Sequence, residues 1–267
     1  MFGHNEIVGR KFFAGRDDLM VTSVFHTLQC EGPFAGRPAV FVRLSRCNLA
    51  CSFCDTSFEH GQWMTRDALV DAMITAVQGP GALKGLHFRD KVLVITGGEP
   101  MLQYDALLPF LVSCSGFFAK VQIESNGLLR GPLPDNIVLV ISPKCIDNHY
   151  ARLPYEVMKR ANCLKFVITA NASSPYNTVP EWAFDWRKQY KRPVYVMPMA
   201  QYTSYPATLP LAGGDLAQRS AAERVSFWEP GLLHLDRVRA NHEYAATYAL
   251  EHGLYLTLQM QLFTSLP

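Results

Sequence analysis

Short runs of apolar residues recur along the chain and alternate with segments in which apolar residues return at helical spacing. The runs are rich in branched side chains, which is typical of strands covered on both faces. Strands are therefore predicted at residues 21–28, 39–44, 92–96, 121–124, 137–142, 164–169, 194–197 and 254–259. Helical spacing predicts a helix that begins after Thr65, and further helices at residues 107–112, 155–160, 181–190 and 235–252.

Strands that alternate with helices favour a parallel sheet with covering helices, and about six of the predicted strands follow this pattern. No second core is visible, so we predict an α/β fold in a single domain, an incomplete (β/α) barrel at residues 21–267. Residues 1–20 have little apolar periodicity and are predicted to form a loose N-terminal extension. Residues 200–229, rich in proline and glycine, are predicted to be a C-terminal insertion or a lid.

Composition limits the classes of protein that fit this pattern. The 267 residues are 49% apolar and 18% charged, and the net charge of +2 gives no reason to expect a nucleic-acid partner. No apolar run is long enough to span a bilayer and no signal-peptide layout is present, so we expect a cytoplasmic protein without a membrane partner. Seven cysteines, an odd number, indicate reduced thiols.

Cys47, Cys51 and Cys54 have the spacing C-x3-C-x2-C directly after the predicted strand 39–44. Three thiolates on one loop can hold three irons of a cubane cluster, because soft sulfur ligands select iron–sulfur centres. The fourth iron would keep an open position for a substrate or cofactor. A zinc site of three cysteines and a histidine, or a disulfide with a spare thiol, also fits this spacing.

Other polar motifs follow predicted strands, where a (β/α) barrel gathers its chemistry. Gly97-Gly98-Glu99-Pro100 comes after the strand 92–96. Its glycines permit close approach of backbone to a ligand, and its carboxylate could pair with an ammonium group. Glu124-Ser125-Asn126-Gly127 and Ser142-Pro143-Lys144 follow the next two strands and offer hydrogen-bonding groups, or serve as caps and turns.

Together, the cysteine loop and the Gly-Gly-Glu-Pro motif resemble the radical S-adenosylmethionine (SAM) superfamily. A larger set of segments, in order, is similar to the 7-carboxy-7-deazaguanine synthase family, known as QueE. These segments are TLQCEG at 27–32, GRPAVF at 36–41, CDT at 54–56, TGGEPMLQ at 96–103, ESNG at 124–127 and SPK at 142–144. The resemblance covers about residues 21–199 and returns at the extreme C-terminus.

This resemblance implies a barrel of the radical SAM type and a carbon–nitrogen lyase. The family converts 6-carboxy-5,6,7,8-tetrahydropterin to 7-carboxy-7-deazaguanine with loss of ammonia, on the route to queuosine and related 7-deazapurines of tRNA or DNA modification. The implied cofactors are a [4Fe–4S] cluster, SAM and Mg²⁺. The implied partners are the small pterin substrate, an electron donor such as flavodoxin or ferredoxin, and a second copy in a homodimer, with no direct nucleic-acid contact.

The resemblance also assigns roles to residues. The cluster ligands are Cys47, Cys51 and Cys54, and Thr56 supplies a hard oxygen to Mg²⁺. The SAM-binding residues are Phe53, Asp55, Gly98, Glu99, Ser125, Ser142, Pro143, Lys144, Met197, Pro198, Met199 and Ala200. The substrate-binding residues are Leu28, Gln29, Cys30, Glu31, Arg43, Thr96, Gln261 and Pro267. Arg43 suits the substrate carboxylate, Gln29 and Glu31 suit the amide and amino edges, and the chain-terminal carboxylate of Pro267 suits the guanidine-like edge.

Three departures from the family pattern stand out. Cys30 replaces a usual glycine, Gln261 replaces a histidine of the tail, and Met197-Pro198-Met199-Ala200 replaces a Q-P-M-D-like stretch. Cys30 and Gln261 leave open a metal-binding homologue without catalysis, and the cysteine spacing is also shared by the glycyl-radical-enzyme activases. An activase has no pterin to hold, so Gln29, Glu31, Arg43 and the proline terminus speak against it.

Overall fold

The computed structural model describes residues 6–56, 58–78, 88–202 and 233–264. Within these residues the main sheet has nine strands in the order β11-β10-β9-β6-β5-β4-β2-β1-β3. The strands are β1 (Leu19–Leu28), β2 (Pro38–Leu44), β3 (Gln62–Met64), β4 (Val92–Gly97), β5 (Lys120–Ser125), β6 (Ile137–Ile141), β9 (Cys163–Ile168), β10 (Val194–Pro198) and β11 (Tyr255–Leu256). β11 and β3 are its two edges, so the sheet is an open, incomplete barrel, as predicted.

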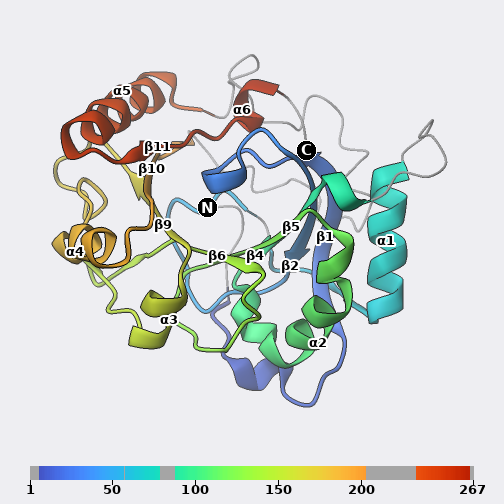
Figure 1. The fold of residues 1–267 in the computed structure, drawn as a ribbon. Coiled ribbons are helices and arrows are strands. Elements are labelled where there is room, and N and C mark those ends of the chain that lie inside the picture. Colours follow the sequence, from blue (N-terminus) through green and yellow to red (C-terminus); the bar gives the residue numbers. More distant parts are fainter. Residues whose placement is uncertain (1–5, 57, 79–87, 203–232, 265–267) are drawn as a thin grey trace.

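The helices lie around the outside of this curved sheet (Figure 1). They are α1 (Arg66–Gln78), α2 (Tyr104–Cys114), α3 (Tyr155–Arg160), α4 (Glu181–Tyr190), α5 (Leu235–His252) and α6 (Gln261–Thr264). Thr65 caps α1 as expected, since its Oγ1 accepts a hydrogen bond from the Ala68 amide at 3.2 Å. The apolar face of α1, with Leu69 and Met73, packs into the main core.

From β2 to β11 the neighbouring strands are parallel, which confirms the predicted parallel sheet. Residues Val92 to Ile95 of β4 are fully buried, as expected of a strand covered on both faces. β1 is an exception: it runs antiparallel to β2, because the turn at residues 29–37 returns the chain directly. At the other edge, β11 spans two residues of the predicted 254–259 strand.

The prediction of a loose N-terminal segment is wrong for residues 6–18. Val8 and Phe13 are buried with Leu102, and a short 3-10 helix spans Arg10–Phe13. The Val8 amide donates to the Cys47 carbonyl at 3.0 Å, so this segment packs directly on the cysteine loop. Its apolar residues are too few to show a period, which is why the pattern gave no signal.

Residues 203–232, most of the predicted insertion, and Pro267 lie outside the described residues. The division of the chain at residue 20 and the role of the insertion stay predictions. Two short strands that were not predicted, β7 (Cys145–Ile146) and β8 (His149–Tyr150), form a separate hairpin after β6. In the described part of the chain, no helix is both long and apolar enough to cross a bilayer.

Candidate active site

The three cysteines lie on the loop that leaves the carboxyl end of β2. Burial raises the pKa of Cys47 to about 12 and that of Cys54 to about 11. The ammonium group of Lys144 lies near the loop and lowers the pKa of both Cys51 and Cys54, against the larger effect of burial. This cation offsets part of the charge that three thiolates would bring. All seven cysteines are free thiols.

This donor set fits a cubane cluster. Among the described residues, no three His, Cys, Asp or Glu side chains converge on a point that could hold one metal ion. A cubane binds each cysteine to a different iron, so its ligands do not have to meet at one point.

The Gly-Gly-Glu turn after β4 is locked to the cysteine loop by its backbone. The amide of Gly98 donates to the Leu44 carbonyl at 3.0 Å, and that of Glu99 donates to the Arg46 carbonyl at 2.9 Å. A Cβ at Gly98 would lie 1.8 Å from the Arg46 carbonyl oxygen. The close approach predicted from these glycines is thus an approach to the protein's own backbone.

Glu99 joins this turn to the end of β5. Its carboxylate is fully buried and accepts hydrogen bonds from the Asn126 amide at 2.7 Å, the Ser125 hydroxyl at 2.8 Å and the Met101 amide at 3.0 Å. Burial raises the pKa of Glu99, and these three donors oppose that rise. Contact of Glu99 with the SAM ammonium group stays a prediction; what the structure adds is its role in holding two strand ends together.

The other predicted SAM residues gather beside the cysteine loop. Lys144 Nζ donates to the Ser142 hydroxyl at 2.6 Å, and burial lowers its pKa. Phe53 lies edge-on to Tyr176 at 4.8 Å between ring centroids. Both aromatic rings belong to one apolar cluster with Met197 and Met199. An apolar wall and polar strand ends therefore flank the loop, an arrangement suited to an adenosyl ligand with a charged tail.

The predicted substrate residues lie around a buried charged group. Lys165 on β9 is 2.5 Å from a carboxylate oxygen of Glu31 and 3.4 Å from one of Glu124. Gln29 donates to Glu124 at 3.1 Å. The sequence predicted Gln29 and Glu31 as substrate residues and the motif at 124–127 as a source of hydrogen-bonding groups, but it did not single out Lys165 or Glu124. The signal available was one lysine inside an otherwise apolar strand.

The C-terminal tail contacts the residues around this charged group through every second side chain, from Thr257 to Gln261. Thr257 Oγ1 accepts from the Gly32 amide at 2.8 Å, and Gln259 donates to Asp55 at 2.6 Å. Gln261 donates to Glu31 at 3.5 Å. The tail thus contacts both the turn after β1 and the cysteine loop.

The remaining predicted residues are placed nearby. Arg43 and Thr96 are register partners on β2 and β4, and the Arg43 guanidinium lies 5.5 Å from the centre of the Phe25 ring. Cys30 donates to the Leu28 carbonyl at 3.3 Å, and Thr56 donates to Asp55 at 3.1 Å.

An open α/β barrel, with a three-cysteine loop after β2 that is locked to a Gly-Gly-Glu turn after β4, defines a radical SAM enzyme. The chain is 37% identical over 202 residues to the 7-carboxy-7-deazaguanine synthase of Rickettsia prowazekii, covering 75% of this chain and 81% of that protein. It is 34% identical over 208 residues to the synthase of Rhodospirillum rubrum, covering 74% and 82%. The chain therefore belongs to the 7-carboxy-7-deazaguanine synthase family.

The fold agrees with this assignment. The crystal structure of QueE from Escherichia coli matches with a TM-score of 0.53 and 17% identity, covering 95% of this chain and 99% of that one. A scan against protein-family models finds no match. The glycyl-radical-enzyme activase considered above is not favoured by these relatives.

Proposed function

We propose that the protein converts 6-carboxy-5,6,7,8-tetrahydropterin to 7-carboxy-7-deazaguanine with loss of ammonia. The observation that carries the proposal is the 37% identity to a 7-carboxy-7-deazaguanine synthase over 75% of the chain, a match that extends well beyond the cysteine loop. The gathering of Gln29, Glu31 and the tail around one buried charged group supports it, because a heterocycle with amide and amino edges needs such acceptors and donors.

When bound, the [4Fe–4S] cluster and SAM supply the 5'-deoxyadenosyl radical that removes a hydrogen atom from the pterin. Cys47, Cys51 and Cys54 would hold the cluster, and Lys144 would offset its negative charge. The apolar wall with Phe53 would exclude water from the adenosyl group. These tasks need a site that is rigid before ligands arrive, and the hydrogen bonds of Glu99 support that rigidity.

On the substrate side, Glu31 would accept hydrogen bonds from the amino edge of the pterin, while Gln29 would meet its amide. Arg43 would form a paired contact with the substrate carboxylate. Thr56 and Asp55 would supply oxygen atoms to Mg²⁺ or its water ligands. Pro267 would place the terminal carboxylate on the guanidine-like edge, as the family resemblance implies.

The wider setting is also proposed from the family. The protein would act in the cytoplasm as a homodimer, take electrons from a flavodoxin or ferredoxin, and supply a queuosine-type pathway of tRNA modification.

The test is an anaerobic assay with cluster-reconstituted protein, SAM, a reductant, Mg²⁺ and carboxytetrahydropterin, with the products identified by mass spectrometry. We expect 7-carboxy-7-deazaguanine from the wild-type protein and none from Cys51→Ala, which lacks one cluster ligand. Cleavage of SAM without any deazaguanine would keep the radical chemistry and overturn the substrate.

A further inference from the structure

Three charged side chains meet inside the sheet, and stability alone does not account for them. Lys165 on β9, Glu124 on β5 and Glu31 after β1 have side chains that are 5%, 19% and 15% exposed. Removing an ion from water costs several kcal/mol even when it is paired, and apolar residues of similar size often stabilise a fold better. A buried group of this kind on the inner face of a barrel therefore points to a task in the site.

The two carboxylates are not equivalent. Glu124 accepts from Lys165, from Gln29 at 3.1 Å and from Gln122 at 2.8 Å. Glu31 accepts from Lys165 through Oε2, whereas its Oε1 receives the 3.5 Å contact from Gln261. Glu124 thus receives three donors and Glu31 two, so Glu31 keeps the larger capacity to accept further hydrogen bonds.

A second acceptor lies beside that oxygen. Gln261 uses its amide nitrogen toward Glu31, and its Oε1 is buried without a hydrogen-bond partner among the described residues. A buried acceptor left unpaired destabilises the protein, and a ligand with N–H donors would remove that cost. Glu31 and Gln261 together therefore present acceptors suited to an amino group and a neighbouring ring N–H.

We propose that Lys165 is the positioning residue for substrate recognition: anchored by Glu124, it holds Glu31 as a carboxylate directed at the N–H edge of the pterin. This inference rests on the proposed function. It assigns Glu124 and Lys165 a role through Glu31, not by contact with the reacting atoms. One ammonium group thus faces two carboxyl groups, of which Glu31 lies beside the tail.

Removal of the ammonium group would change what Glu31 offers to the ligand. Burial raises the pKa of Glu31 and the charge of Lys165 opposes that rise, while Glu124 adds to it. Without Lys165, Glu31 would take up a proton, and the protonated acid would present an O–H donor to the N–H donors of the pterin. The expected defect is therefore in binding of the pterin, and binding of SAM is unaffected.

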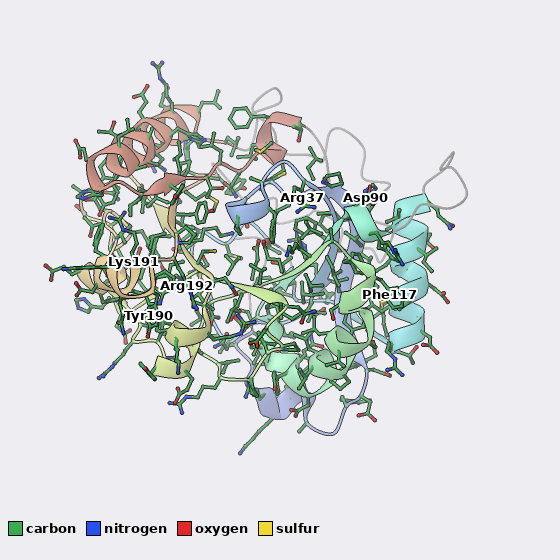
Figure 2. All side chains as sticks on the ribbon, in the orientation of Figure 1. Arg37, Asp90, Phe117, Tyr190, Lys191 and Arg192 are labelled. Atoms are coloured by element: carbon green, nitrogen blue, oxygen red, sulfur yellow. The ribbon has the colours of Figure 1, made fainter. Side chains whose placement is uncertain are left out.

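The test compares Lys165→Met with Lys91→Met. Lys91 is a matched control, because its side chain is 3% exposed and pairs with Asp90 at 2.8 Å, at the opposite end of β4 from the site. Figure 2 shows Asp90 away from the centre of the molecule. For Lys165→Met we expect KM for carboxytetrahydropterin to rise roughly 100-fold, with similarly weakened equilibrium binding of 7-carboxy-7-deazaguanine. Iron content and pterin-free SAM cleavage are expected to match those of wild type and of Lys91→Met.

Two further variants keep the inference testable if Lys165→Met fails to assemble a cluster. Lys165→Arg retains the charge and is expected to keep most of the pterin affinity. Glu124→Gln weakens the anchor and is expected to raise KM about tenfold while SAM cleavage stays unchanged. An unchanged KM in Glu124→Gln, or a parallel loss of SAM cleavage and pterin affinity in a Lys165→Met protein with wild-type iron content, would overturn the inference.

The same experiment separates this inference from the proposed function. If wild type converts the pterin and Lys165→Met does so with the same KM, the inference alone fails. If wild type cleaves SAM but neither converts the pterin nor binds the deazaguanine, the proposed function and the inference fail together.

Discussion

At the scale of single residues, the site depends on two kinds of position. At the first kind only glycine fits, and at the second a buried polar group is held by several hydrogen bonds. Gly98 is one such position, because the carbonyl of Arg46 occupies the space that a Cβ would need. Glu99 is the other kind, with three donors around a buried carboxylate. Both residues hold the cysteine loop against the ends of β4 and β5.

We predict that Gly98→Ala prevents stable assembly of the cluster. The added methyl group would lie 1.8 Å from the Arg46 carbonyl oxygen, so the two loops must separate and lose their hydrogen bonds. Iron and sulfide content after anaerobic reconstitution measures the effect, and we expect less than about a tenth of the wild-type amount for a loss above 1.4 kcal/mol. Gly116→Ala is the control, since a Cβ there meets nothing within 4 Å; equal iron content in both variants would contradict the prediction.

Cys30, where the family usually has glycine, is predicted to be an unreactive thiol. Burial, and after it the charge of Glu31, raises the pKa of Cys30 from 9.0 to about 11. At pH 8 its thiolate fraction is therefore about 100-fold smaller than that of a free cysteine. Alkylation by iodoacetamide, followed by peptide mass spectrometry, should be slow at pH 8 and increase up to pH 11.

The raised pKa of Cys30 also makes the free energy of unfolding depend on pH. The folded state disfavours the Cys30 thiolate. The neutral thiol therefore contributes to the free energy of unfolding below pH 9, and this contribution is lost as the pH rises toward 11. Cys30→Gly should remove this part of the pH dependence and keep deazaguanine synthesis. Loss of synthesis in that variant would show that the cysteine has become part of the substrate site.

At the scale of elements, the buried parallel strands were predictable and the edges were not. Apolar runs such as residues 92–96 and 137–142 matched β4 and β6 because both of their faces are covered. β3 and the β7–β8 hairpin are two or three residues long, too short for any period. The antiparallel direction of β1 depends on a turn, and the partners of Lys165 lie 134 and 41 residues away along the chain. The local pattern of apolar and polar residues does not predict contacts between residues so far apart in the sequence.

The tail is predicted to serve substrate binding and not SAM cleavage. Deletion of residues 261–267 removes the Gln261 contact to Glu31 and buried Leu262, but leaves Thr257 and Gln259 in place. The loss of one buried leucine costs about 2–5 kcal/mol, which a domain of this size can tolerate. We expect pterin-free SAM cleavage to persist and deazaguanine synthesis to fall at least about 100-fold; a parallel fall in both activities would contradict this division.

The N-terminal segment is predicted to stabilise the cysteine loop from outside. Phe13 is 6% exposed and lies 5.9 Å from Trp63 between ring centroids, beneath the Val8 contact to Cys47. Phe13→Ala should lower the free energy of unfolding of the cluster-free protein by about 3 kcal/mol, measured by urea titration. Phe117→Ala is the control, because that ring is 63% exposed. Equal effects of the two substitutions would mean that the segment is not packed.

At the scale of the whole molecule, the site joins segments from both halves of the sheet. The cysteines follow β2, Glu99 follows β4 and accepts from Ser125 at the end of β5, β9 carries Lys165, and the tail after β11 returns to Glu31 and Asp55. The two edges of the open sheet do not pair with each other among the described strands. Contacts through the site therefore link regions that backbone pairing leaves separate.

Ligands that occupy this site should therefore stabilise the entire fold. A ligand present at 100 times its dissociation constant adds about 2.7 kcal/mol to the free energy of unfolding. For a domain of this size, that corresponds to a rise in Tm of about 5–10 °C. We expect SAM and 7-carboxy-7-deazaguanine each to give such a rise in the cluster-loaded protein under anaerobic differential scanning calorimetry.

The two ligands should differ in their dependence on the buried charges. Lys165→Met should remove most of the rise in Tm caused by 7-carboxy-7-deazaguanine and keep most of the rise caused by SAM, because the ammonium group is paired with Glu31 on the pterin side. Cys51→Ala should weaken the SAM effect instead, because the open iron of the cluster is the expected anchor for SAM. If Lys165→Met lost both effects, the charged group would be a general support of the barrel, and its assignment to substrate recognition would be wrong.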